Sequence, residues 1–242
     1  MKGSTISTTS TTLTYAHITR YISTACRKVR SEYAGKQICQ RYQREESVID
    51  GRLDSAHGEK WFLNRLVHHL RVIHPKLPIE RSTTREWYDI RVCGIPINLK
   101  LTCGGTDNAF NKMSIEYTIR GEVPVKKKIT FNEWLDRLVE ALPSMSERRD
   151  RRREYHYLVF NKKDGRFRFT SLLDIRAFRS NPTNILQICW RREFQPDPSV
   201  TRLRYEKGKT VCGILEVIRQ SLLQDYERKK RFLEMDFSWG PR

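Results

Sequence analysis

The sequence of 242 residues lacks any apolar run that could span a membrane. A spanning helix needs about 18 or more consecutive apolar residues, and the mean hydropathy of this chain is −0.66. No basic amphipathic segment is set apart from the rest of the chain, which is the other common route to a lipid surface. We therefore expect no membrane partner.

Paired cysteines are also lacking. The chain has 6 cysteines but no C-x-x-C pair, and no secretory signal precedes them. This pattern favours reduced thiols and a cytoplasmic location over a disulfide framework.

The first 31 residues contain no acidic side chain. They are rich in Ser and Thr and carry Arg20, Arg27, Lys28 and Arg30. Such a composition occurs in transit peptides, and it also occurs in basic N-terminal arms that contact DNA. Residues 3–14 form a low-complexity polar stretch within this segment, and we expect it to be a disordered tail.

Acidic residues are scarce in the chain as a whole. The 28 Asp and Glu residues face 46 Lys and Arg residues, which gives a formal net charge of +18. Because Lys and Arg displace counterions from phosphates, this excess indicates a polyanionic partner, and nucleic acid fits best. The apolar content of 38%, with 10 Tyr and 10 Phe, is typical of a folded globular protein.

The periodicity of the apolar residues predicts an α/β fold. We divide the chain into a polar tail (1–14), an N-terminal helical region (15–54) and a main domain (55–242). Helices are predicted over 15–42 with a break at Gly35, over 55–74 with Ser55 as N-cap, over 106–119, over 130–142 with Thr130 and Glu133 as a capping box, and over 212–232. Strands are predicted over 77–80, 87–92, 95–102, 155–161, 166–169 and 185–190.

Two of these strands, 87–92 and 95–102, are joined by a tight turn at Cys93 and Gly94. Side chains alternate between the two faces of a strand. Asp89 on the first strand can therefore project to the same side as Asn98 and Lys100 on the second.

Hydrolysis of a phosphodiester is assisted by a metal ion that activates water, and by a cation near the developing negative charge. The order helix, strand, Asp89-bearing strand, Asn98-Leu99-Lys100 strand and helix resembles the PD-(D/E)xK nuclease superfamily, in an Asn-x-Lys form that occurs among type II restriction endonucleases. The chain departs from the motif at Tyr88, where the superfamily has Pro, and at Asn98, where it has an acid.

The resemblance implies a mixed central β-sheet flanked by helices, and a Mg²⁺-dependent endonuclease that cleaves double-stranded DNA at a short specific site. Asp89 would bind the magnesium ion, with Asn98 or Glu59 completing its ligands, because an Asn carbonyl can coordinate a hard cation. Glu59 continues the apolar stripe of helix 55–74 and so faces inward. Lys100 would orient the water or neutralise the phosphate. Residues 55–242 would form the nuclease domain with its DNA-recognition elements, and a palindromic target implies a homodimer.

DNA contacts are expected after the catalytic strand and in a late polar-ended strand that resembles one in restriction enzymes. Arg side chains match guanine, and Asn or Gln side chains match adenine. Other members of the set can cap turns or pair within the sheet instead. The candidates are Asn108, Lys112, Asn181, Asn184, Gln187, Arg191 and Arg192.

Other interpretations of the same residues remain open. Asp89 and Lys100 also suit a cross-strand ion pair on a solvated face, and Glu59 suits a partner of the helix dipole. At the level of function, the alternatives are a repair or structure-specific nuclease of the same fold, and a non-catalytic nucleic-acid-binding protein with a decayed site.

Overall fold

The computed structural model describes residues 13–35, 51–83, 86–102, 107–109, 112–123, 129–145, 150–162, 164–183, 185–194 and 207–234. The predicted tail and the predicted helix beyond Gly35 lie outside these ranges, apart from residues 13 and 14 of the tail. The helices and strands are α1 (Tyr15–Gly35), α3 (Gly51–Ile73), β1 (Ile79–Arg81), β2 (Ile90–Val92), β3 (Ile95–Thr102), β4 (Asp107–Ala109), α4 (Lys112–Arg120), α5 (Phe131–Met145), β5 (His156–Asn161), β6 (Phe167–Ser171), β7 (Phe178–Asn181), β8 (Ile185–Cys189), α6 (Trp190–Phe194) and α7 (Lys207–Leu233).

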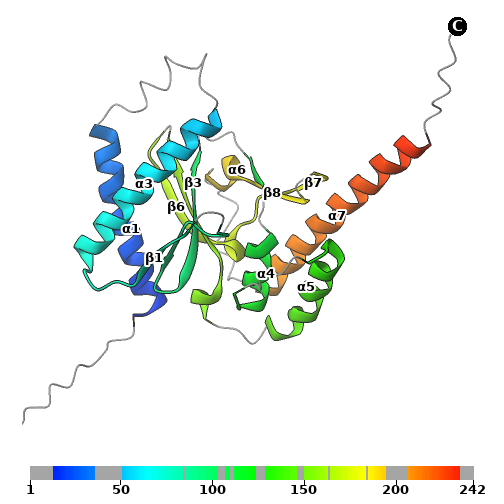
Figure 1. The fold of residues 1–242 in the computed structure, drawn as a ribbon, viewed down its shortest axis with the longest axis horizontal. Helices are drawn as coiled ribbons and strands as arrows, with labels where there is room; N and C mark the ends of the chain where they lie inside the picture. Colours follow the sequence, from blue (N-terminus) through cyan, green and yellow to red (C-terminus); the bar gives the residue numbers. More distant parts are fainter. Residues whose placement is uncertain are drawn as a thin grey trace, which may run out of the picture.

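A five-stranded sheet in the order β1-β2-β3-β5-β6 forms the centre of the fold (Figure 1). β3 and β5 run parallel, and the other neighbouring strands of this sheet are antiparallel. Helices lie on both sides of the sheet (Figure 1). The predicted mixed α/β architecture with a helix-flanked mixed sheet is thus confirmed at this level.

α1 and α3 cover one face of the central sheet. Their apolar stripes meet the inward side chains of β2, β3 and β5 in one core, which includes Ile22, Phe62, Leu66, Ile97 and Leu158. Residues 15–35 therefore share a hydrophobic core with the central sheet.

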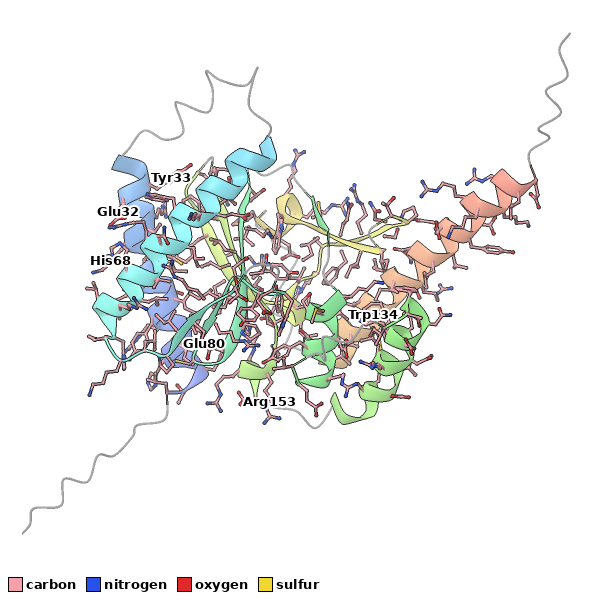
Figure 2. The ribbon with its side chains drawn as sticks, viewed as in Figure 1. Glu32, Tyr33, His68, Glu80, Trp134 and Arg153 are labelled. Carbon is pink, nitrogen blue, oxygen red and sulfur yellow. The ribbon has the colours of Figure 1, made fainter. Side chains whose placement is uncertain are left out.

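The opposite face of the sheet packs against α4, α5 and α7, together with a second sheet of three strands in the order β4-β8-β7. Trp134 of α5 and Trp190 of α6 are buried in this second core. Figure 2 shows Trp134 on this side of the molecule, away from Glu32 on α1 and His68 on α3. Among the described residues, no helix has both the length and the apolar character that a membrane span requires.

Several predicted boundaries are wrong. α3 begins at Gly51, so Ser55 lies inside the helix and is not its N-cap; Ser is tolerated within helices and does not force a start. The segment 106–119 is split, because Asp107–Ala109 pairs with β8 as strand β4 and the helix begins only at Lys112. Trp190 starts α6 instead of ending the strand.

The predicted hairpin between β2 and β3 is present, and its turn is confirmed. Cys93 and Gly94 have φ values of 50° and 80°, as a type I′ turn requires. Only Ile90–Val92 is regular strand, so Asp89 directly precedes β2. Alternation along the predicted strand 87–92 would place Tyr88 on the same face as Ile90 and Val92, but Tyr88 packs in the core that contains Trp134, whereas Ile90 and Val92 pack in the core formed with α1 and α3.

The predicted capping box of α5 is confirmed. The backbone amide of Thr130 donates to Glu133 Oε2 at 2.6 Å, and the Glu133 amide donates to Thr130 Oγ1 at 3.2 Å. These reciprocal bonds satisfy amides that have no partner within the helix, so the start of α5 could be predicted from two side chains.

A buried polar cluster joins the start of α1 to the start of β5. Tyr15 Oη lies 2.9 Å from His156 Nε2, and His156 Nδ1 lies 2.8 Å from the carbonyl oxygen of Glu154. Because a carbonyl only accepts, Nδ1 carries the ring proton and Nε2 accepts from Tyr15. Burial lowers the pKa of His156 to about 4, so the ring is neutral at pH 7.

Candidate active site

The candidate site lies where β2 ends and β3 continues. The pairing between these strands covers Ile95 to Ile97, and the Asp89 amide adds one further bond to the Ile97 carbonyl at 3.0 Å. β3 then runs on to Thr102. Its edge on the β2 side therefore continues past the end of the β2 pairing.

Two carboxylates accept from the backbone amides along this edge. The Leu99 amide donates to Asp89 Oδ2 at 2.6 Å, and the Leu101 amide donates to the Glu59 carboxylate. Residues two apart in a strand direct their amides to the same edge. Asp89 and Glu59 are thus brought to adjacent positions although they are 30 residues apart in sequence.

A glycine allows α3 to bring Glu59 this close to β3. A Cβ atom at Gly58 would lie 2.8 Å from Leu101 Cδ1, closer than Cβ atoms approach other heavy atoms in proteins. The absence of a side chain at Gly58 lets the helix pass directly over the strand. The next residue, Glu59, then reaches the Leu101 amide.

Lys100 completes the group with a positive charge. It lies between Leu99 and Leu101, and its Nζ atom is 3.8 Å from Glu59 Oε1. The side chains of Lys100 and Glu59 are 28% and 29% exposed, so both remain accessible to a ligand. The structure therefore brings Asp89, Glu59 and Lys100 together.

The two carboxyl groups are destabilised in their charged forms. Burial raises the pKa of Asp89, against the opposing effects of the Leu99 amide and Lys100. Burial also raises the pKa of Glu59; Lys100 opposes this shift, and the neighbouring Asp89 charge adds to it. A buried pair of like charges is stabilised by a nearby cation.

Asn98 lies two residues before Lys100 on β3, and its side chain lies near Tyr155. Burial raises the pKa of Tyr155, and Asn98 opposes this rise; the Tyr155 hydroxyl donates its one proton to the Trp87 carbonyl at 2.6 Å. The Asn98 Oδ1 atom is buried and has no hydrogen-bond partner within the described part of the chain.

These groups suit a hard cation better than a soft one. In the described ranges, no cluster of three or more His, Cys, Asp or Glu side chains could hold a metal ion. Magnesium, however, is commonly bound by one or two carboxylates together with water and substrate phosphates. The carboxylates of Asp89 and Glu59, with the unpaired Oδ1 of Asn98, fit that requirement.

The predicted DNA-contact residues are distributed elsewhere in the fold. Lys112 is exposed, and its Nζ lies 4.3 Å from the centre of the Phe131 ring in a cation–π contact. Asn181 Oδ1 accepts from the Thr183 amide at 2.8 Å and so stabilises the turn after β7. Gln187 is half-buried on β8.

The remaining candidates divide into exposed and undescribed side chains. Arg191 and Arg192 are exposed on α6. Asn108 pairs with Ile188 in the β4–β8 ladder, but its side chain lies outside the described part of the structure, as does all of Asn184.

One residue near the site was not predicted. Lys162 follows β5 directly, its amide donates to the Thr102 carbonyl at 2.8 Å, and its charge lowers the pKa of Glu59. Its position after a predicted strand was visible in the sequence. The parallel pairing of β5 with β3, which brings it to the site, was not.

Comparison of the chain with protein-family models, with curated proteins and with solved structures gives no match. The site is therefore interpreted from its own chemistry and from the resemblance of its motif.

Proposed function

We propose that this protein is a magnesium-dependent endonuclease that cleaves double-stranded DNA at a short specific site, as type II restriction enzymes do. The observation that carries the proposal is the placement of Asp89 at the Leu99 amide and of Glu59 at the Leu101 amide, on the same edge of β3, with Lys100 between these two residues of the strand. The formal net charge of +18 supports a polyanionic substrate.

The order of elements supports a PD-(D/E)xK type of core. α3 is followed by the antiparallel strands β1, β2 and β3, then by the short strand β4 of the second sheet, by the helices α4 and α5, and by β5 parallel to β3. In this arrangement Asp89 precedes the second strand, and Asn98 and Lys100 lie on the third.

The roles of the side chains follow from their chemistry. Asp89 and Glu59 would hold a magnesium ion, with Asn98 Oδ1 as a neutral third ligand. When bound, the ion would polarise the scissile phosphate and lower the pKa of a water molecule. Lys100 donates hydrogen bonds to the attacking water or to the phosphate oxygens, which gain negative charge as the new P–O bond forms and the old one breaks.

The proposed enzyme acts as a homodimer. A palindromic site presents the same phosphate geometry on both strands, and a two-fold pair of identical subunits matches that symmetry. One Asp89-centred site in each subunit would then cut one strand.

The test is cleavage of supercoiled plasmid DNA with Mg²⁺ by the wild-type chain and by Asp89→Asn and Lys100→Ala variants. We expect discrete fragments from the wild type, and rates lower by on the order of 100- to 1,000-fold for both variants. Mobility-shift assays should show that both variants still bind DNA. Asp136→Asn and Lys60→Ala are matched controls, because Asp136 lies on the distant α5 and Lys60 is exposed beside Glu59.

Three outcomes would contradict the proposal. Cleavage by Lys100→Ala at the wild-type rate would remove the assigned role of this residue. Nicking that depends on DNA branches would favour a repair or structure-specific nuclease. Binding without any magnesium-dependent cleavage would favour a non-catalytic nucleic-acid-binding protein.

A further inference from the structure

The β7–β8 hairpin has two different faces. Leu186 and Ile188 of β8 are fully buried on the face that packs against α7. Side chains one position away point to the other face of the hairpin. Arg179 of β7 is exposed there, and Gln187 of β8 is half-buried.

Arg179 and Gln187 form a cross-strand pair at the centre of this open face. They are direct register partners in the antiparallel ladder, and Arg179 Nη2 donates to Gln187 Oε1 at 2.8 Å. The contact orients the planar guanidinium group, which has five N–H donors in a fixed fork. Side chains held in this way lose little conformational entropy when they bind a ligand.

We infer that the open face of the β7–β8 hairpin reads base pairs in the major groove of duplex DNA, with Arg179 as the specificity-determining residue. The inference rests on the proposed function. The major groove is about 12 Å wide and admits protein β-structure, and β7, which carries Arg179, is an edge strand of the three-stranded sheet β4-β8-β7. Arg recognises guanine through its O6 and N7 atoms, and Gln187 sets the plane in which the Arg179 fork is presented.

The hairpin lies within reach of the DNA that the candidate site would cut. β4 pairs with β8 and begins at Asp107, five residues after Thr102, the last residue of β3. Five residues span at most about 18 Å, which corresponds to roughly five base-pair steps. Arg191 and Arg192 follow β8 on α6 and are exposed, so they suit phosphates that flank the base pairs being read.

The test separates base reading from catalysis by measuring binding. A cleavage-defective Asp89→Asn chain selects bound duplexes from a pool with random sequence, and the enriched sequences are determined. The same selection is made after adding Arg179→Ala, Arg179→Lys or the control Arg219→Ala, which removes an exposed arginine paired with Glu216 on α7.

We expect the parent chain to enrich a defined sequence that contains guanine at one position. Arg179→Ala should lose that preference by about tenfold or more, because it has no donor for guanine O6 and N7. Arg179→Lys should lose part of it, because a compact ammonium group replaces the planar fork that Gln187 orients. Arg219→Ala should retain it. Full preference in Arg179→Ala would overturn the inference, as would a parent chain that enriches no sequence.

Cleavage assays in the otherwise wild-type chain distinguish failure of the two proposals. Arg179→Ala should keep magnesium-dependent cleavage but cut at a relaxed set of sites. An unchanged set of sites would overturn the inference and leave the nuclease proposal intact. Sequence-selective binding by a chain that never cuts DNA would overturn the nuclease proposal and leave the inference about the hairpin intact.

Discussion

The neutral ring of His156 makes the stability of the fold depend on pH. Its pKa is lowered from 6.5 to about 4, chiefly by burial and also by Arg151, while the Glu154 carbonyl and Asp174 oppose the shift. Below pH 6.5 the unfolded chain binds a proton that the folded ring does not bind. The free energy of unfolding therefore falls as the pH drops from 6.5 to about 4, and this contribution then levels off.

This loss amounts to about 3 kcal/mol, because one pKa unit corresponds to about 1.4 kcal/mol. Denaturant titrations between pH 7 and pH 4 measure it in the wild type and in His156→Gln, whose amide can still accept from Tyr15. The variant should be less stable at pH 7 but should lose less stability on acidification. Val72→Ala, at an exposed position of α3 without a titratable side chain, is the control and should leave the slope unchanged. Equal slopes in His156→Gln and the wild type would contradict the prediction.

Asn98 differs from the acid expected at its position, and its unpaired Oδ1 gives a prediction at the same scale. If this oxygen binds the ion, Asn98→Asp should retain cleavage within about tenfold, whereas Asn98→Ala should need about 10- to 100-fold more Mg²⁺ for half-maximal rate. Magnesium titrations of the cleavage rate measure both. Thermal unfolding separates this effect from the lost contact with Tyr155. Wild-type behaviour of both variants would leave Asp89 and Glu59 as the whole ligand set.

The contact between α3 and β3 can be tested as an element. Gly58→Ala introduces a methyl group that would lie 2.8 Å from Leu101 Cδ1, so either the Leu101 side chain or the part of α3 around Gly58 must shift. Alanine also favours a helix by about 1 kcal/mol over glycine, which offsets part of the strain. We expect a small change in unfolding temperature and a fall in cleavage rate of about tenfold or more, because catalysis is sensitive to displacements on the order of 1 Å.

The experiment compares two measurements, the unfolding temperature and the rate of DNA cleavage. Glu59→Gln, which keeps the size of the side chain, should reduce cleavage without moving the helix. Gly58→Ala with full activity and lower stability would show that the close approach serves packing and not the placement of Glu59.

The elements that carry the site could be predicted to different degrees. The β2–β3 hairpin follows from strict alternation and from Cys93-Gly94, and the position of Glu59 follows from the apolar stripe of α3. β4 could not be predicted, because the strand Asp107–Ala109 exists only through its pairing with β8. Lys162 was missed for the same reason, since a parallel neighbour is set by the tertiary fold and leaves no local pattern in the sequence.

At the scale of the whole molecule, the excess of basic residues predicts strong salt dependence. With a formal net charge of +18, the cleavage-defective Asp89→Asn chain should bind duplex DNA with an affinity that falls linearly on a logarithmic scale as salt rises. Six or more phosphate contacts correspond to a loss of about 1,000-fold or more between 50 and 200 mM salt. Fluorescence anisotropy at several salt concentrations measures the slope, and a slope near zero would contradict a phosphate-dominated interface.

The open edge of β3 has a consequence for solubility. A strand edge with free amides can pair with a strand of another molecule, and proteins often prevent this by placing charged groups there. Asp89 and Glu59 occupy the amides of Leu99 and Leu101, so the groups assigned to metal binding also shield this edge from self-association. Removing both carboxylates to obtain an inactive protein would therefore expose a surface on which copies of the chain can aggregate.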